Sequence, residues 1–80
     1  MARTRDGIRL NDILRVAEAI GASIREGTSH LYVLNYAGMR PCPVGESTDA
    51  RRMLVPWLRR VTDQDNGTIY RALRNGEWGD

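Results

Sequence analysis

His30-Leu31-Tyr32-Val33-Leu34-Asn35-Tyr36, residues 30–36, is the stretch that decides the fold class. It is rich in side chains that favour extended backbone and contains neither Gly nor Pro, so it predicts a β-strand. Residues 26–28 precede it as a turn, with room for a short strand over 22–25. Residues 37–38 follow at hairpin spacing, and the chain returns as a third strand over 39–44. The expected sheet therefore has three antiparallel strands.

Two prolines mark the third strand as an edge strand. Pro41 and Pro43 have no backbone N–H to donate to a neighbouring strand. They share one parity, so both nitrogens can face away from the partner strand.

A helix is expected before the sheet, over residues 11–20. Asn11 is placed to cap it, and Gly21 is placed to end it. Apolar residues recur at i, i+3, i+4 and i+7, namely Ile13, Val16, Ala17 and Ile20.

A second helix is expected after the sheet, with Ser47 or Thr48 as its cap. Its apolar stripe consists of Ala50, Met53, Leu54, Trp57, Leu58 and Val61. Pro56 interrupts it at a cost of about 3 kcal/mol, so either the helix kinks or residues 53–57 form a strand. We favour the kinked helix. A loop over 62–67 and a short helix over 68–75 follow, closed by Gly76 and anchored by Trp78.

The composition fits one globular domain over residues 1–80, with a core at about 11–61 and a C-terminal helical extension at about 62–78. With 41% hydrophobic and 28% charged residues, the chain can bury a core and is not typical of a disordered protein. It has no run of about 18 apolar residues and no signal-type leader, so we expect a cytoplasmic protein without a membrane segment. Cys42 and His30 are the only residues of their types, which predicts no disulfide, no metal site and no cofactor.

The net charge of the chain is small, but its basic residues are all of one type. All 12 basic residues are arginine, and the net charge is only +2. Arginine binds phosphate through two parallel hydrogen bonds and stacks on bases, which suits RNA. A GC-rich genome that encodes arginine by default explains the same composition, and both interpretations stay open.

The expected order is one helix, three antiparallel strands and a helix, with an extra short helix at the C-terminus. This α+β order resembles the double-stranded-RNA-binding-like (dsRBD-like) fold of HicA toxins, the mRNA interferases of HicAB toxin-antitoxin systems. The sharpest likeness is the segment Gly27-Thr28-Ser29-His30-Leu31 at the entry to the second strand. The resemblance implies that His30 is catalytic, that mRNA is cut, and that a HicB-like antitoxin is the partner.

The resemblance leaves two registers open downstream. In the first, Pro43-Val44 ends the third strand. In the second, Val55-Pro56 ends a longer hairpin, and residues 67–74 become the closing helix of the domain. Both registers keep His30 in the same role.

The chemistry at His30 suits metal-independent cleavage of RNA. A neutral imidazole, with an unperturbed pKa of about 6.5, can take the proton of a 2′-hydroxyl so that its oxygen attacks the adjacent phosphate. Arg25 and Arg40, in the flanking strands, are candidates to neutralise the developing charge. The phosphate-binding candidates of the turn are Gly27, Thr28 and Ser29, and Tyr32 or water is left to protonate the leaving oxygen.

Each candidate also has a purely structural interpretation. His30 is then an ordinary strand residue. Tyr32 and Tyr36, which share its parity, either stack on bases or form the packed side of the sheet. Trp57 and Trp78 are expected to be packing residues. The arginines of the second helix are a solvated face or contact RNA backbone; they are Arg51, Arg52, Arg59 and Arg60.

Two competing functions use the same scaffold. One is a non-enzymatic phage-type inhibitor that occupies a nucleic-acid groove or protein surface of a bacterial defence complex, for example an anti-CRISPR protein. The other is an RNA-binding protein that does not cut its ligand, for which binding falls steeply with salt.

Overall fold

The structure is a computed structural model that describes residues 2–27 and 31–78. Its elements in chain order are α1 (Leu10–Ala19), β1 (Ser23–Glu26), β2 (Tyr32–Asn35), β3 (Cys42–Val44), a π-helical turn η1 (Ala50–Leu54), α2 (Val55–Thr62) and α3 (Asn66–Asn75). The predicted α+β order, helix, three antiparallel strands and helices, is confirmed.

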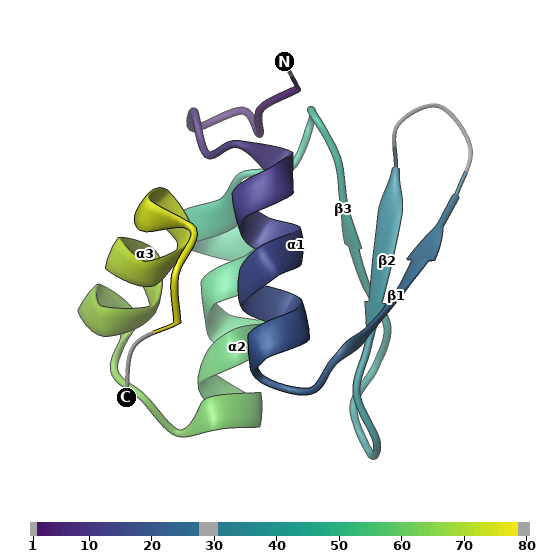
Figure 1. Ribbon diagram of the computed structural model, residues 1–80, viewed down its shortest axis with the longest axis vertical. Coiled ribbons are helices and arrows are strands. Elements are labelled where there is room, and N and C mark those ends of the chain that lie inside the picture. Colours follow the sequence, from purple (N-terminus) through teal and green to yellow (C-terminus); the bar gives the residue numbers. More distant parts are fainter. Residues whose placement is uncertain (1, 28–30, 79–80) are drawn as a thin grey trace.

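The three strands form one antiparallel sheet with β2 in the centre. Its register pairs Arg25 with Val33 and Val33 with Pro43, so β3 is an edge strand, as its prolines predict. Within residues 2–27 and 31–78, all helices lie on one face of this sheet, and the other face carries none of them (Figure 1). The outward row of Arg25, Val33 and Pro43 therefore borders the uncovered face.

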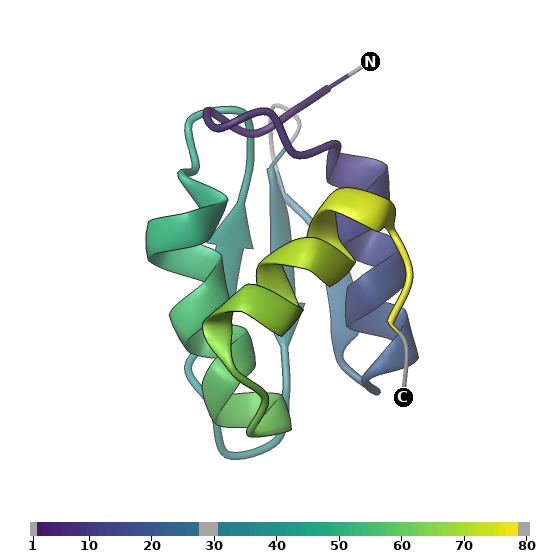
Figure 2. The same ribbon diagram turned by 90° about the vertical axis from the view of Figure 1, so that its left-hand side faces the viewer.

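The helices form two further layers. Helix α1 packs against β1, η1 packs against β3, and α3 contacts both α1 and α2. In the turned view, α3 crosses in front of α1 and α2, with the sheet behind them (Figure 2). The core lies between these layers, and Leu34 of β2 is fully buried in it, as are Val16, Leu54 and Leu73.

The inward face of β2 is the packed side of the sheet. Leu34 has no exposed surface, and Tyr32 and Tyr36 pack partly buried against the core. Of the two interpretations of this tyrosine face, the structure supports packing rather than an open platform for bases.

Helix α1 is closed at Gly21 as predicted but begins one residue earlier than expected, at Leu10. Gly21, at φ +88°, donates to the Glu18 carbonyl, and Ala22 donates to the Ala17 carbonyl, which together close the helix. The bond at Ala22 explains why β1 starts at 23 rather than 22. The cap predicted at Asn11 is wrong, because Leu10 is already helical and its N–H is satisfied by the Ala2 carbonyl at 3.0 Å.

Pro56 is accommodated by a change of helix type. The N–H of Val55 bonds to the carbonyl of Ala50, five residues earlier, which widens the turn before the proline. Pro56 then occupies the first turn of α2, where a missing N–H costs little. The helical interpretation of 53–57 is confirmed. The register that ended the third strand at Val55-Pro56 is wrong, because β3 ends at Val44.

The caps of the later helices differ from the predicted ones. Asp49, not Ser47 or Thr48, caps η1 by accepting from the N–H of Arg52, while the Thr48 hydroxyl accepts from Gly45. Helix α3 starts at 66 rather than 68, because the Asp65 carboxylate caps it through the Thr68 N–H at 2.7 Å. Trp57 and Trp78 both pack against the core, as expected.

Gly76 ends α3 in close contact with α1. It has φ +71°, and a Cβ there would lie 2.5 Å from Oδ1 of Asp12. Asp12 is buried and held by Arg9 at 3.0 Å, so it has little room to move. The C-terminal end of α3 is thus fixed at the start of α1.

We predict that Gly76→Ala destabilises the protein more than Gly21→Ala. Both substitutions place a side chain at positive φ, which costs roughly 1–2 kcal/mol. A Cβ at Gly21 meets nothing within 4 Å, whereas one at Gly76 collides with Asp12, which adds about 1–3 kcal/mol. Urea unfolding of the two variants measures the difference, and equal losses would contradict the close packing at Gly76.

Candidate functional site

The residues predicted from the His30 motif lie at one end of the β1–β2 pair. Thr28, Ser29 and His30 lie outside the described residues. On either side of them, the N–H of Gly27 donates to the carbonyl of Leu31 at 2.6 Å. Arg25, two residues before Gly27, is exposed on the uncovered face of the sheet.

The other two predicted residues point elsewhere. Tyr32 packs against the core on the opposite face of the sheet from Arg25. Val44 of β3 pairs with Tyr32, and Arg40 lies four residues before Val44. At strand spacing, Arg40 is therefore about 13 Å along the strand from the position of Tyr32. The structure therefore brings Arg25 and Gly27 to one end of the sheet and places Arg40 toward the other.

Arg40 belongs to a separate hollow at the β2–β3 turn. Its carbonyl accepts from the indole Nε1 of Trp57 at 2.6 Å, which fixes the turn against α2. Its side chain borders a hollow of about 310 Å³ with Trp57, Arg60 and the residues of the turn.

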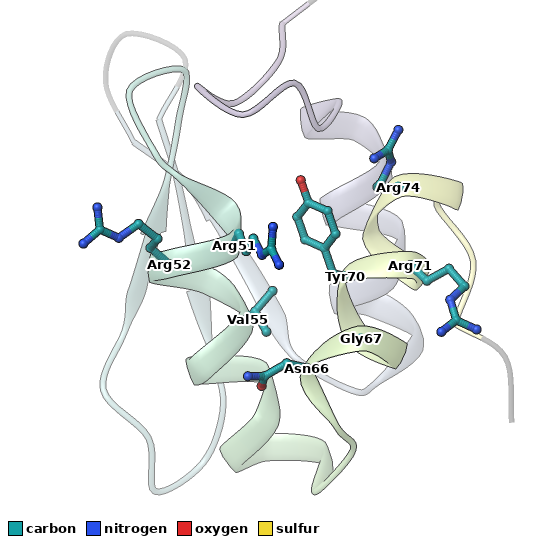
Figure 3. A pocket seen from close by; sticks show the side chains of 8 residues that line it. All are labelled: Arg51, Arg52, Val55, Asn66, Gly67, Tyr70, Arg71 and Arg74. Atoms are coloured by element: carbon teal, nitrogen blue, oxygen red, sulfur yellow. The ribbon is translucent and has the colours of Figure 1, made fainter.

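A larger groove opens between η1 and α3, on the side of the molecule away from the sheet (Figure 3). Its volume is about 510 Å³, and its lining residues are Arg51, Arg52, Val55, Asn66, Gly67, Tyr70, Arg71 and Arg74. We call it the arginine groove. From the sequence, Arg51 and Arg52 were expected on a solvated helix face or in contact with RNA backbone, and no site was expected on α3. Tyr70, Arg71 and Arg74 are spaced so that they share one side of α3. That spacing was the sequence signal from which the arginine groove could have been predicted.

The carboxylate of Asp6 holds the two walls of the arginine groove together. Its Oδ1 accepts from the Thr4 hydroxyl at 2.7 Å and from the Ala50 N–H at 2.9 Å. Its Oδ2 accepts from the Arg51 N–H at 3.1 Å and from the Tyr70 hydroxyl at 3.3 Å. One side chain of the N-terminal segment thus joins the first turn of η1 to α3.

The protonation of this cluster follows from its contacts. Burial raises the pKa of Asp6, but the hydrogen bonds from Thr4, Ala50 and Arg51 outweigh it and hold the pKa below the ordinary value. Partial burial, followed by the negative charge of Asp6, raises the pKa of Tyr70. Tyr70 therefore stays protonated at neutral pH and donates to Asp6, with its ring 5.6 Å from the Arg51 guanidinium.

The groove is positively charged, and its four guanidinium groups form no ion pair in the described part of the chain. Across residues 2–27 and 31–78 the one ion pair joins Arg9 to Asp12, so Arg51, Arg52, Arg71 and Arg74 have no carboxylate oxygen within 4.0 Å there. Asp65 is exposed near Arg71, and its pKa is lowered mainly by the hydrogen bond from Thr68, with a contribution from Arg71. The arrangement is suited to an anionic ligand.

We predict that Asp6→Asn lowers the free energy of unfolding by about 1–3 kcal/mol at pH 7, because an amide NH₂ faces the N–H groups of η1. The folded-state pKa of Asp6 is depressed, so its stabilisation is present above 3.8 and is lost as the pH falls through the folded value. The gap between wild type and variant should therefore close in acid. Urea unfolding against pH measures it.

The matched control is Asp63→Asn, since Asp63 is exposed and adopts a left-handed conformation that Asn also tolerates. It should change stability little at any pH. A pH-independent difference for Asp6→Asn would contradict the role of its charge.

None of the described helices is long and apolar enough to cross a membrane. Comparison with known proteins finds no matching family model, no matching curated protein and no matching solved structure. Proposals about function therefore start from the side chains of this chain itself.

Proposed function

We propose that the protein is a HicA-like toxin, a metal-independent endoribonuclease that cuts mRNA with His30 as its single catalytic histidine. The observation that carries this proposal is the geometry around the motif. Gly27 and Leu31 close the β1–β2 connection through a 2.6 Å bond, and Arg25 is exposed on the strand that leads into it. The α-β-β-β-α order is the one that the resemblance implies.

The proposed reaction is an internal transesterification. Neutral His30 takes the proton of a 2′-hydroxyl, a bond forms between the 2′-oxygen and phosphorus, and the bond from phosphorus to the 5′-oxygen breaks. The leaving 5′-oxygen takes a proton from water or from the imidazolium. The products are a 2′,3′-cyclic phosphate and a 5′-hydroxyl end.

Arg25 is better placed than Arg40 to neutralise the pentacoordinate phosphorus, since Arg40 lies toward the other end of the sheet. Gly27, Thr28 and Ser29 are proposed to hold the phosphate. Tyr32 faces the core, so water is the better candidate for the second proton transfer.

The proposed setting is the cytoplasm, where mRNA is the substrate and a HicB-like antitoxin is the partner. An acidic surface on that partner would complement the exposed arginines.

The second candidate is a non-enzymatic binding module, such as an inhibitor of a bacterial defence complex or a nucleic-acid-binding protein. It is favoured by the arginine groove, whose charges have no close partner in the described part of the chain. Such a module needs the groove but does not need His30.

We predict that expression of the wild type from a tightly repressed promoter arrests growth and fragments mRNA, and that His30→Ala abolishes both. Loss of a general base lowers the rate about 10²–10⁴-fold. Purified protein should leave 2′,3′-cyclic phosphate ends, and RNA with a 2′-deoxy nucleotide at the cleaved position should stay intact.

Two controls make the result interpretable. The melting temperature of His30→Ala should match that of the wild type, and Arg59→Gln, on the exposed side of α2, should remain toxic. A folded, abundant wild type that leaves growth and RNA unchanged would sink the ribonuclease proposal and leave the binding module.

A further inference from the structure

We propose that the arginine groove binds a nucleotide unit within a single-stranded nucleic acid, with the phosphate on Arg51 and Arg74 and the base beside Tyr70. This site goes beyond the proposed ribonuclease centre. It is formed by η1 and α3, on the side of the molecule away from the sheet (Figures 2 and 3).

The first argument is the charge of the groove. Four guanidinium groups line one hollow, and none has a carboxylate within ion-pair distance among the described residues. Like charges gathered in a partly apolar cleft repel one another, and an anion that enters relieves this repulsion. Each guanidinium presents a planar set of donors that matches two phosphate oxygens at once.

The second argument is the arrangement of these groups. Arg51 extends to Tyr70 from η1, and Arg74 lies at the hydroxyl end of the same ring, while Arg52 and Arg71 extend away on either side (Figure 3). Two arginines therefore flank the tyrosine, and the other two lie at the margins. This distribution suits one phosphate near the ring and further phosphates along a strand.

The third argument is the apolar part of the groove. The partly buried ring of Tyr70 gives it an apolar surface suited to a planar base, and the amide of Asn66 lies in the same lining as donor and acceptor. The Tyr70 hydroxyl is already engaged by Asp6, so the ring offers its face rather than its oxygen. A volume of about 510 Å³ falls within the roughly 300–1,000 Å³ that is usual for small-ligand sites.

The groove is also fixed before any ligand arrives. Asp6 bonds to the N–H of Arg51 on one wall and to Tyr70 on the other. A preformed site loses less conformational entropy on binding than a site whose side chains must first become ordered.

A strand fits better than a free nucleotide because the groove continues. Arg74 also borders a second hollow of about 500 Å³, whose lining includes Arg3 and Arg9 together with the carboxylates of Asp6 and Asp12. Asp12 is paired with Arg9 and Asp6 accepts four hydrogen bonds, so Arg3 is the guanidinium left for a chain that leaves the first groove past Arg74. An acidic peptide would satisfy the charges but would leave the ring of Tyr70 without a planar partner.

The test measures binding of a fluorescein-labelled single-stranded DNA oligonucleotide to the full chain by fluorescence anisotropy. DNA lacks the 2′-hydroxyl, so the probe cannot be cut by the proposed chemistry. The groove variant is the double substitution Arg51→Gln with Arg74→Gln. Both side chains are exposed, and Asp6 contacts only the backbone of Arg51, so the fold should persist, which circular dichroism and thermal melting check.

The matched control is Arg59→Gln with Arg60→Gln, which removes the same charge from exposed positions of α2 outside the groove. We expect the groove variant to bind at least about 10-fold more weakly and to lower the slope of log K against log salt by about 0.7, the loss of one phosphate contact. The control should bind within about 2-fold of the wild type at the same salt.

The substitution Tyr70→Leu tests the base contact independently, because it removes the ring. Tyr70→Phe is its control, since Phe keeps the ring and loses only the hydrogen bond to Asp6. Loss of binding in Leu but not in Phe supports the stacked base, whereas equal binding by both overturns it. His30→Ala should bind the probe as tightly as the wild type does. Binding at the groove can therefore be tested even if the ribonuclease proposal fails.

Three outcomes would overturn the proposal. Equal weakening by the groove and control variants would mean that the oligonucleotide responds only to net charge. Binding of adenosine monophosphate as tightly as the oligonucleotide would assign the groove to a free nucleotide. Displacement of the probe by poly-glutamate at equal charge concentration would assign it to an acidic protein segment.

Discussion

The rest of the structure depends on the carboxylate of Asp6. It accepts four hydrogen bonds, which tie the N-terminal segment to the first turn of η1 and to Tyr70 of α3. Three of the four partners lie 44 to 64 residues away in the sequence, so these bonds form only when the helices are already in place. Because hydrogen bonds to an ionised group contribute about 1.5–3 kcal/mol, the Asp6 carboxylate helps to fix the N-terminal segment, η1 and α3 relative to one another, beside the apolar core that packs the layers. It also places Arg51 and Tyr70 on facing walls of the arginine groove.

The layered arrangement separates two surfaces of different character. One is the uncovered face of the sheet with Arg25, next to the Gly27 to Leu31 connection. The other is the arginine groove, on the side away from the sheet. The third helix creates the second surface, because it packs across α1 and α2 and adds three of the groove's charged or aromatic side chains. Under the two proposals, a short chain of one domain would hold an anionic strand at two places.

The sequence predicted the elements that local chemistry dictates. The apolar spacing of α1, the positive-φ glycine at 21 and the prolines that mark the edge strand each act within a few residues, and the helix, its end and the edge strand were confirmed. The strand itself is shorter than the expected 39–44, because β3 spans Cys42–Val44 and includes only Pro43 of the two prolines. Non-local contacts were missed. At the start of α1 the Leu10 N–H donates to the carbonyl of Ala2, and the sequence predicted the wide turn at Pro56 only as a kink. The groove depends on α3 lying beside η1, which no pattern within either segment encodes. The motif residues 28–30 lie outside the described residues, so His30 stays a prediction.

The most direct test of the whole account is an NMR titration of the uniformly ¹⁵N-labelled His30→Ala protein with single-stranded RNA, following backbone amides and arginine Nε–Hε groups. We predict saturable shifts at Arg51 and Arg74 together with shifts at Gly27 and Leu31. Both sets shift when one RNA strand spans the groove and the proposed catalytic centre, or when a second strand occupies that centre. Shifts that leave both the groove and the Gly27 to Leu31 connection unchanged would contradict it.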